Sequence, residues 1–232
     1  MIDQRTVLGI IPARGGSKRI PRKNLQLVLG KPLIAWTIEE AKQSKYLDRV
    51  ILSSEDPEII SVANTWGCEV PFVRPVELAQ DETAGVAPVL HAISELPGYD
   101  IVVLLQPTSP LRAVGDIDRC LEYFIAKHAD SCVSITKVQQ SPDWMCTLDT
   151  GGVIRPFSPS IQTGIQHQDQ SPVYALNGAI YIAGCNYLTA NRAFVGTATL
   201  GFVMPLERSI DVDTEIDLKL ASVILERNHG KT

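Results

Sequence analysis

The sequence predicts a doubly wound α/β domain with a mostly parallel sheet and helices on both faces. Over about the first 130 residues, short β-branched runs alternate with segments whose apolar residues recur every three to four positions. The β-branched runs are apolar throughout, which is typical of strands covered on both faces. This alternation favours right-handed βαβ units on a parallel sheet. A chain of 232 residues, 45% of them hydrophobic, suits one such domain with a modest insertion.

The strands and helices can be assigned in chain order. Val7–Pro12 is the first predicted strand, and a long polar loop follows it at residues 13–26. Pro32 is expected to open the first helix, because proline suits the first helical turn. Further strands are predicted at residues 49–54, 70–73, 101–105, 131–138, 179–183 and near 200–204. Further helices are predicted from 57 to the stop at Gly67, at 89–96, at 116–127, as a short element after 183, and at 215–226.

Residues 139–173 interrupt this alternation. The segment is polar and contains several prolines, and Gly151-Gly152 indicates a hairpin turn. We therefore expect a single domain over residues 1–232 that carries a small insertion at 139–173.

Composition excludes several classes of protein. The 21 basic and 26 acidic residues give a net charge of −5, which argues against a general nucleic-acid binder. No apolar run approaches the ~18 residues of a membrane span, and no secretory signal is visible. The five scattered cysteines are expected to be reduced thiols. We expect a soluble, cytoplasmic protein with neither nucleic acid nor membrane as a partner.

A basic loop follows the first predicted strand. It contains Gly15-Gly16-Ser17, whose short side chains let backbone N–H groups approach an anion. Without its five cations the chain has 16 basic and 26 acidic residues, a net charge of −10, so the loop is a focused positive site. Ligands of doubly wound folds sit at this edge of the sheet, and phosphate is the natural ligand. The alternative is a solvated basic loop. The cations are Arg14, Lys18, Arg19, Arg22 and Lys23.

The two commonest phosphate-binding motifs are missing. The loop contains neither G-x-x-x-x-G-K-[ST] nor G-x-G-x-x-G, so a P-loop NTPase or a dinucleotide-binding dehydrogenase is not expected.

Asp211 and Asp213 precede the last predicted helix. Carboxylates two residues apart can point to one side of an extended segment. Two converging carboxylates repel unless a cation lies between them, and Mg²⁺ prefers oxygen ligands of this kind. Helix capping is the alternative, with Asp213 or Thr214 as the N-cap and Glu215 in the first turn.

Asn177 and Tyr181 flank the start of another predicted strand. Because they are four residues apart, they are expected on one face of that strand, where both would line a pocket. In the alternative interpretation, Asn177-Gly178 is a turn and Tyr181 is a half-buried strand residue. The four histidines show no metal-ligand spacing.

Five short motifs are spread over nearly the whole chain. They lie at residues 11–24, 78–83, 105–112, 177–181 and 211–214, and read IPARGGSKRIPRKN, LAQDET, LQPTSPLR, NGAIY and DVDT. In this order they closely resemble the motifs of the acylneuraminate cytidylyltransferases, the CMP-sialic acid synthetases. The resemblance implies a Rossmann-like sheet of the nucleotide-diphospho-sugar transferase type.

This resemblance also implies an activity. CMP would be transferred from CTP to the anomeric hydroxyl of a sialic-acid-like 2-keto-3-deoxy sugar acid, with release of pyrophosphate and a requirement for Mg²⁺. CTP and a nonulosonic acid are then the substrates, and the product serves cell-surface polysaccharide biosynthesis.

The resemblance assigns roles to individual residues. Arg14 and Lys23 would bind the triphosphate and stabilise the leaving group, and Asp211 and Asp213 would hold the metal, with Arg14, Lys23 and Asp211 as the catalytic set. The nucleotide-binding residues implied are Ala13, Arg14, Gly15, Gly16, Ser17, Lys23, Asn24, Thr83 and Gln106. The sugar-binding residues implied are Gln106, His167, Asn177, Tyr181 and Phe194.

His167 departs from the family pattern. It stands where sialic-acid-activating members usually carry an arginine for the sugar carboxylate, and a histidine cannot offer a bidentate fork. Either another cation such as Arg155 replaces that arginine, or a partner subunit does, or the acceptor differs. The neighbouring residues 168–174 look more like members that activate legionaminic-type sugars.

The family forms homodimers through a segment like residues 139–173, so a homodimer is expected, with Trp144, Met145 and the hairpin near Gly151 at its interface. The alternative for this segment is a surface loop.

Two other functions remain open at this point. One is a cytidylyltransferase for 3-deoxy-manno-octulosonate. The other is a nucleotide-binding module without turnover, against which the four residues Arg14, Lys23, Asp211 and Asp213 argue.

Overall fold

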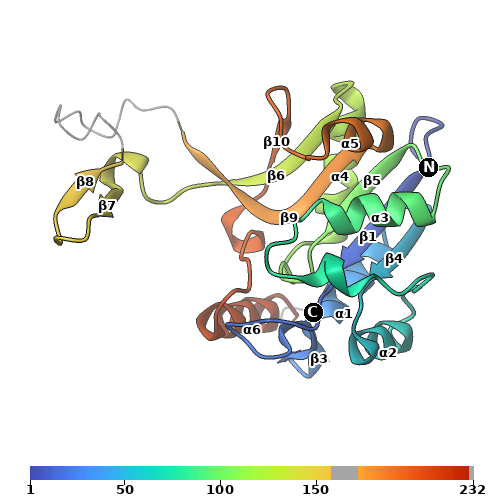
Figure 1. Ribbon diagram of the computed structural model, residues 1–232, viewed down its shortest axis with the longest axis horizontal. Coiled ribbons are helices and arrows are strands. Elements are labelled where there is room, and N and C mark those ends of the chain that lie inside the picture. Colours follow the sequence, from blue (N-terminus) through green and yellow to red (C-terminus); the bar gives the residue numbers. More distant parts are fainter. Residues whose placement is uncertain (158–171, 230–232) are drawn as a thin grey trace.

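A six-stranded sheet runs through the computed structural model, which describes residues 1–157 and 172–229 (Figure 1). The strand order is β10-β6-β9-β5-β1-β4, and β9 is antiparallel to both of its neighbours while the other pairings are parallel. The predicted doubly wound, mostly parallel α/β fold is confirmed. The strands are β1 (Val7–Pro12), β4 (Arg49–Ser53), β5 (Ile101–Leu105), β6 (Ser131–Lys137), β9 (Tyr174–Gly184) and β10 (Leu200–Val203).

Helices and short hairpins complete the fold. The α-helices are α1 (Leu33–Lys42), α2 (Pro57–Thr65), α3 (Ala87–Glu95), α4 (Val114–Ala126), α5 (Cys185–Asn191) and α6 (Glu215–His229). Two hairpins stand outside the sheet, β2 (Leu27–Val28) with β3 (Lys31–Pro32), and β7 (Cys146–Leu148) with β8 (Ile154–Pro156). Single 3-10 turns occur at η1 (Lys23–Leu25), η2 (Val76–Ala79), η3 (Pro142–Trp144) and η6 (Leu206–Arg208).

The central strands are apolar throughout because both faces of the sheet are covered. Alternate residues of β1 and β5 enter two separate cores: Val7 and Val103 pack against α1, α2 and α4, whereas Leu8 and Val102 pack against α3 and α5. A third core lies between α6, α1 and the β2–β3 hairpin. The regular period of two in these strands therefore sets which helices lie on which face.

The fold brings several loops to one edge of the sheet. Loops 13–26, 54–56 and 106–113 leave the carboxyl ends of the parallel strands β1, β4 and β5. Because β9 runs antiparallel, its beginning near Asn177 lies at this same edge. Ligands of open α/β sheets bind at this edge, so the architecture predicts where the site is.

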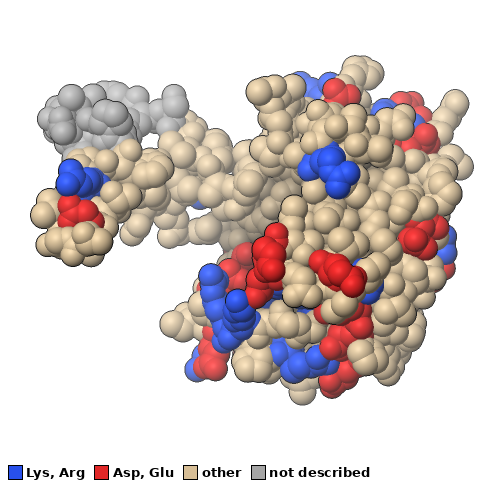
Figure 2. All heavy atoms as spheres, viewed as in Figure 1, with Lys and Arg blue, Asp and Glu red and all other residues tan. Residues whose placement is uncertain are grey.

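The segment predicted as an insertion leaves the body as an arm. Figure 1 shows the β7–β8 hairpin far from the sheet, at the end of extensions from β6 and β9. Its apolar side chains are largely exposed, including Trp144, Leu148 and Phe157, and in Figure 2 most of the arm is uncharged apart from a basic and an acidic group near its end. The expected hairpin turn at Gly151-Gly152 is present, with Gly152 at a φ of +80°. The predicted dimerisation through this segment remains a prediction.

The predicted strand at residues 70–73 is wrong. Ile51 forms a single parallel bridge with Glu69, and no strand follows in this described stretch. Pro71 explains the interruption, because a proline has no N–H to donate to a sheet. The remaining predicted elements are present, although β9 begins five residues earlier than the predicted 179–183 and is antiparallel.

Two further expectations can be compared with the structure. All five cysteines are free, and all but Cys146 are buried. Among the described helices, none has the length and apolar character needed to cross a membrane.

Candidate functional site

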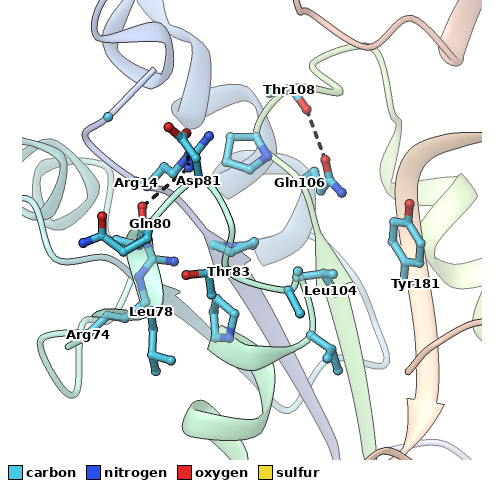
Figure 3. A pocket seen from close by; sticks show the side chains of 18 of the residues that line it. Arg14, Arg74, Leu78, Gln80, Asp81, Thr83, Leu104, Gln106, Thr108 and Tyr181 are labelled. Carbon is cyan, nitrogen blue, oxygen red and sulfur yellow. Dashed lines mark hydrogen bonds and ion pairs between the residues drawn. The ribbon is translucent and has the colours of Figure 1, made fainter. Parts of the chain in front are cut away.

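A pocket of about 610 Å³ opens at the carboxyl edge of the sheet. Loop 13–26 and the segment 78–86 form one side of it, and Gln106, Tyr181 and Phe194 form the other (Figure 3). The structure therefore brings residues from four of the five sequence motifs to one cavity, and only the motif at 211–214 contributes no lining residue. The predicted site residues that line it are Arg14, Gly16, Ser17, Lys23, Asn24, Thr83, Gln106, Tyr181 and Phe194.

The cations of the basic loop are each paired with a carboxylate. Arg14 and Lys18 both contact Asp81, at 2.9 and 2.5 Å. Arg19 and Lys23 both contact Asp213, at 2.8 and 3.0 Å. Figure 2 shows the result, since basic and acidic side chains lie beside one another on the lower part of the body. Two carboxylates from other parts of the chain, Asp81 and Asp213, therefore neutralise four of the loop's cations.

The start of the loop is held by acidic residues that follow β4. The Gly15 N–H donates to Glu55 Oε1 at 2.7 Å, so this amide is already engaged, whereas Gly16 and Ser17 face the pocket. Asp56 caps α2 by accepting from two backbone N–H groups of its first turn. The Arg22 guanidinium donates to the same carboxylate at 2.5 and 2.8 Å and holds the pKa of Asp56 below its usual value. The loop and α2 are thus a single ion-paired unit.

Gly15 is a position where only glycine fits. A Cβ added there would lie 2.3 Å from Asp56 Oδ2, whereas one added at Gly16 would meet nothing within 4 Å. We expect Gly15→Ala to separate Arg22 from Asp56 and to lower the free energy of unfolding by about 1–3 kcal/mol. Gly16→Ala is the matched control and is expected to change it by less than about 0.5 kcal/mol. Chemical denaturation of both variants makes the comparison, and equal stabilities would contradict the tight contact.

The basic loop and the aspartate pair meet in space. Lys23 Nζ donates to the Val212 carbonyl oxygen at 2.8 Å as well as to Asp213 Oδ1. Val212 N–H in turn donates to the Thr108 carbonyl oxygen at 2.8 Å, which joins this segment to the loop after β5. Residues almost 200 positions apart in the sequence are therefore hydrogen-bonded neighbours.

Asp211 and Asp213 have different surroundings. The Lys23 ammonium group holds the pKa of Asp213 below its usual value. Burial raises the pKa of Asp211, and the neighbouring charge of Asp213 adds to the rise although a hydrogen bond with Thr108 opposes it. Within the described residues Asp211 has no cationic side chain at ion-pair distance. A carboxylate without such a partner would be stabilised by a bound cation.

The donor set fits a hard divalent cation that is shared with a ligand. No group of three or more histidine, cysteine, aspartate or glutamate residues suited to a metal occurs in the described part of the chain. Asp211 and Asp213 would therefore be the protein's share, and phosphate and water oxygens would complete the shell, as is common for Mg²⁺. The capping alternative is confirmed for Thr214 and not for Asp213: Thr214 precedes α6 and its Oγ1 accepts from the Asp217 N–H at 3.3 Å, while the Asp217 carboxylate accepts from the Thr214 N–H and Glu215 lies in the first turn.

Gly178 lies next to two side chains of the site. It has a φ of +74°, and a Cβ at this position would lie 3.6 Å from Gln106 Oε1 and 3.8 Å from Asp211 Oδ2. Gln106 is fixed at its backbone carbonyl oxygen, which accepts from the buried guanidinium of Arg112 at 3.2 Å. The polar end of Gln106 and the Asp211 carboxylate thus converge on one point beside β9.

Tyr181 and Phe194 form an aromatic wall. Their ring centroids are 5.5 Å apart, and both line the pocket together with Leu104. Burial raises the pKa of Tyr181, so the phenol is neutral at physiological pH. Figure 3 shows Tyr181 and Gln106 on the side of the cavity opposite Arg14 and Asp81, which gives the pocket a charged half and an aromatic half.

Asn177 and Tyr181 do not share a face, contrary to expectation. Val133 of β6 pairs with Tyr181 of β9, and Ile135 pairs with Leu176. Two steps along β6 therefore correspond to five steps along β9, so β9 bulges there. The bulge, with Gly178 at positive φ, turns Asn177 away from Tyr181. Asn177 is 5% exposed and does not line the pocket.

Two other predicted site residues can be placed in the structure, and a third cannot. Ala13 is buried, and its carbonyl oxygen accepts from Arg74 at 3.2 Å. Asn24 lines the pocket, and its amide donates to the Arg14 carbonyl oxygen at 3.0 Å. His167 lies outside the described residues.

Sequence reasoning missed two charged residues of the pocket. Arg74 is buried, donates to Glu55 Oε2 at 2.5 Å, and has an Nε with no hydrogen-bond partner in the described portion of the chain. Asp81 bridges Arg14 and Lys18. Asp81 lies within the LAQDET motif, which was a usable signal, whereas Arg74 stands in a proline-flanked stretch that was assigned to a strand and a loop.

Comparison with known proteins identifies relatives of this chain. A family model described as cytidylyltransferase matches residues 8–149. A CMP-N,N'-diacetyllegionaminic acid synthase of Legionella pneumophila is 34% identical over 96% of this chain and 97% of its own length. A pseudaminic acid cytidylyltransferase of Campylobacter jejuni is 36% identical over 96% and 97%. An N-acylneuraminate cytidylyltransferase of Escherichia coli is 31% identical over 96% of this chain but only 53% of its own length.

A solved structure supports the fold. The CTP complex of CMP:2-keto-3-deoxy-manno-octonic acid synthetase superposes with a TM-score of 0.73, over 96% of this chain and 99% of that one. Its sequence is 18% identical, so the likeness concerns the fold alone.

Proposed function

This chain belongs to the cytidylyltransferase family and transfers CMP from CTP to a sugar acid of the nonulosonic type, and we propose that its acceptor is a legionaminic-type acid and its metal Mg²⁺. The observation that carries the proposal is the contact of Lys23 with both Val212 and Asp213, which joins the basic loop to the aspartate pair. The loop lines the pocket and the aspartate pair adjoins it, so a metal-bound triphosphate held by the loop would lie close to both elements.

The reaction forms one bond and breaks one. The anomeric hydroxyl oxygen of the sugar acid attacks the α-phosphorus of CTP, the bond between that phosphorus and the bridging oxygen breaks, and pyrophosphate leaves. The hydroxyl proton is lost to solvent or a nearby base. Positioning and charge neutralisation provide most of the acceleration in such a transfer.

The basic loop acts on the leaving group in this proposal. Arg14 and Lys18 would exchange Asp81 for phosphate oxygens, and Lys23 would be shared between Asp213 and the triphosphate. Gly16 and Ser17 line the pocket and would supply backbone N–H groups. These donors stabilise the negative charge that grows on pyrophosphate.

Asp211 and Asp213 would hold the divalent metal that the family implies. When bound, Mg²⁺ neutralises phosphate charge and acidifies a hydroxyl near it. Asp211 is the stronger candidate ligand, because it lies beside Gln106 Oε1 across Gly178, whereas Asp213 is already paired with Arg19 and Lys23. Gln106 would orient the acceptor from the same side.

The aromatic half of the pocket would receive the sugar acid. Leu104, Tyr181 and Phe194 make this wall apolar. A legionaminic-type acid ends in a methyl group and carries two acetamido groups, whereas the side chain of a neuraminate ends in hydroxyl groups. Hydroxyl groups placed against an apolar wall lose hydrogen bonds with water, so the wall favours the legionaminic-type acid. The sequence features at His167 and residues 168–174 favour the same branch.

The exposed apolar side chains of the β7–β8 arm support a homodimer. Isolated apolar patches of this kind are typical of interfaces. In the proposed dimer the arm, including Trp144 and Met145, packs on the second copy.

A panel of acceptors tests the proposed function. Pyrophosphate release is measured with CTP or UTP, with Mg²⁺ or a chelator, and with legionaminic, pseudaminic, N-acetylneuraminic and 3-deoxy-manno-octulosonic acids. We expect turnover only with CTP and Mg²⁺, and kcat/KM highest for the diacetylated legionaminic acid by about tenfold over the neuraminate. A preference for pseudaminic acid, N-acetylneuraminate or the octulosonate would refute the acceptor proposal.

A further inference from the structure

The amide of Asn177 is buried, and every one of its hydrogen-bonding positions is used. Its Oδ1 accepts from Ser134 Oγ at 2.5 Å and from the Ala179 N–H at 3.2 Å. Its Nδ2 donates to Ser209 Oγ at 2.9 Å and contacts Met204 Sδ at 3.5 Å. Two acceptor and two donor positions are all that an asparagine amide has. None is left for a sugar hydroxyl.

The bond to Ser209 connects Asn177 to the aspartate segment. Ser209 is buried, donates through Oγ to the Pro205 carbonyl oxygen at 2.8 Å, and stands two residues before Asp211. On the other side of Asp211, the Val212 N–H donates to the Thr108 carbonyl oxygen. Asp211 is thus held between two anchors, one from β9 and one from the loop after β5.

Gly178 sets the distance on the pocket side. The Asn177 side chain contacts the buried residues Ser134, Met204 and Ser209. The next residue, Gly178, has its open side next to Asp211 Oδ2 and Gln106 Oε1. The β9 bulge therefore holds Ser209 through Asn177 on one side and adjoins the Asp211 carboxylate through Gly178 on the other.

We propose that Asn177 is a positioning residue for the metal carboxylate Asp211, acting through Ser209, and is not a ligand of the sugar acid. The proposal rests on the proposed role of Asp211 as a ligand of the divalent metal. The amide of Asn177 holds the 205–211 segment against β6 and β9. The Asp211 carboxylate is therefore already in position when the metal binds, and no conformational entropy has to be lost at that step. Partners that orient a ligand in this way typically alter metal affinity 10–100-fold when they are removed.

Ser209→Ala and Asn177→Ala separate this role from sugar binding. Ser209 does not line the pocket, so a sugar acid cannot contact it. We expect both variants to weaken binding of Mn²⁺ in the presence of CTP about tenfold, as measured by electron paramagnetic resonance without any acceptor. KM for the sugar acid is expected to stay unchanged while kcat falls, and the double variant is expected to resemble the single ones. Ser222→Ala, which removes a hydrogen bond to the Leu218 carbonyl oxygen on α6, is the matched control.

Other outcomes overturn the proposal. A raised KM for the sugar acid in Asn177→Ala, with normal Mn²⁺ binding, would make Asn177 a sugar ligand. Normal Mn²⁺ binding in Ser209→Ala would also refute it, and this variant decides the matter alone if Asn177→Ala fails to fold. If the wild-type protein bound Mn²⁺ with CTP but released no pyrophosphate with any acid, the proposed function would fail while this comparison still stood.

Discussion

Asp211→Asn is expected to lower kcat for pyrophosphate release by at least a hundredfold, or about 3 kcal/mol of barrier, while the protein stays folded. The change keeps the shape of the side chain but removes the charge that would hold the metal. Asp211 lies beside Gln106 across Gly178, and the neighbouring Asp213 is already paired with Arg19 and Lys23, so it does not directly replace the lost charge. Pyrophosphate release at saturating CTP and acceptor measures the effect.

The same variant has an opposite expected effect on stability. Burial raises the pKa of Asp211, so the folded state binds this proton more tightly than the unfolded chain does. The carboxyl group therefore favours folding at pH values below its ordinary pKa, and that contribution is lost as the pH rises through the raised value. At pH 7 the charged form of Asp211 disfavours the folded state, and the variant carries no charge at this position. Its free energy of unfolding is therefore expected to match or exceed that of the wild type.

Asp118→Asn is the control, since Asp118 accepts a hydrogen bond from Ser44, which follows the end of α1, and does not line the pocket. It is expected to leave kcat unchanged. Full turnover by Asp211→Asn would remove Asp211 from the mechanism.

Arg112→Met is expected to lower the free energy of unfolding by about 3 kcal/mol. The guanidinium is 1% exposed and donates to the carbonyl oxygens of Gln106 and Ala179 and to Thr37 Oγ1. Methionine fills much of the volume but removes one donor from each of these acceptors. The Gln106 carbonyl oxygen keeps the Ser109 N–H and the Thr37 hydroxyl, whereas the Ala179 carbonyl oxygen and Thr37 Oγ1 lose their charged donor, and each buried unsatisfied group costs about 1 kcal/mol or more. Burial also lowers the pKa of Arg112 to about 10, so the side chain remains a cation at neutral pH.

Arg119→Met is the matched control for that change. Arg119 is largely exposed and pairs with Asp116, which keeps a second partner in Arg208. A surface pair of this kind contributes about 0–1 kcal/mol, so its loss is expected to change stability little. Equal unfolding midpoints for the two variants in urea would contradict the bracing role of Arg112.

The fold could be predicted from the sequence because its signals are local. Strands β1 and β5 were predicted with the bounds that the structure has, since Val7–Pro12 and Ile101–Leu105 are uninterrupted apolar runs between polar loops. The prediction of a strand at residues 70–73 failed for a local reason as well. Val70 and Val73 are β-branched and favour a strand, but Pro71 between them has no N–H to donate to a sheet. The antiparallel direction of β9 depends on pairing across the sheet, which no local pattern records.

The site shows where prediction from motifs stops. The spacing of Asp211 and Asp213 and the cations of loop 13–26 identified two elements, but only the fold shows Lys23 touching Asp213. The period of two placed Asn177 beside Tyr181, and the bulge at Gly178 broke that period. Arg112 belongs to the LQPTSPLR motif, but the sequence does not show that it is buried. Its burial follows from the packing of α1, β9 and the loop after β5, which supply its three hydrogen-bond acceptors.

The central claim is that loop 13–26 and the segment 209–213 grip one metal-bound triphosphate from two sides. A crystal structure of the protein with CTP and Mg²⁺ tests it most directly. The account predicts that Arg14 and Lys23 contact phosphate oxygens, that Asp81 has left Arg14, and that the metal joins Asp211 to the same triphosphate. A nucleotide bound to the loop with its phosphates turned away from Asp211, or a metal held elsewhere, would contradict it.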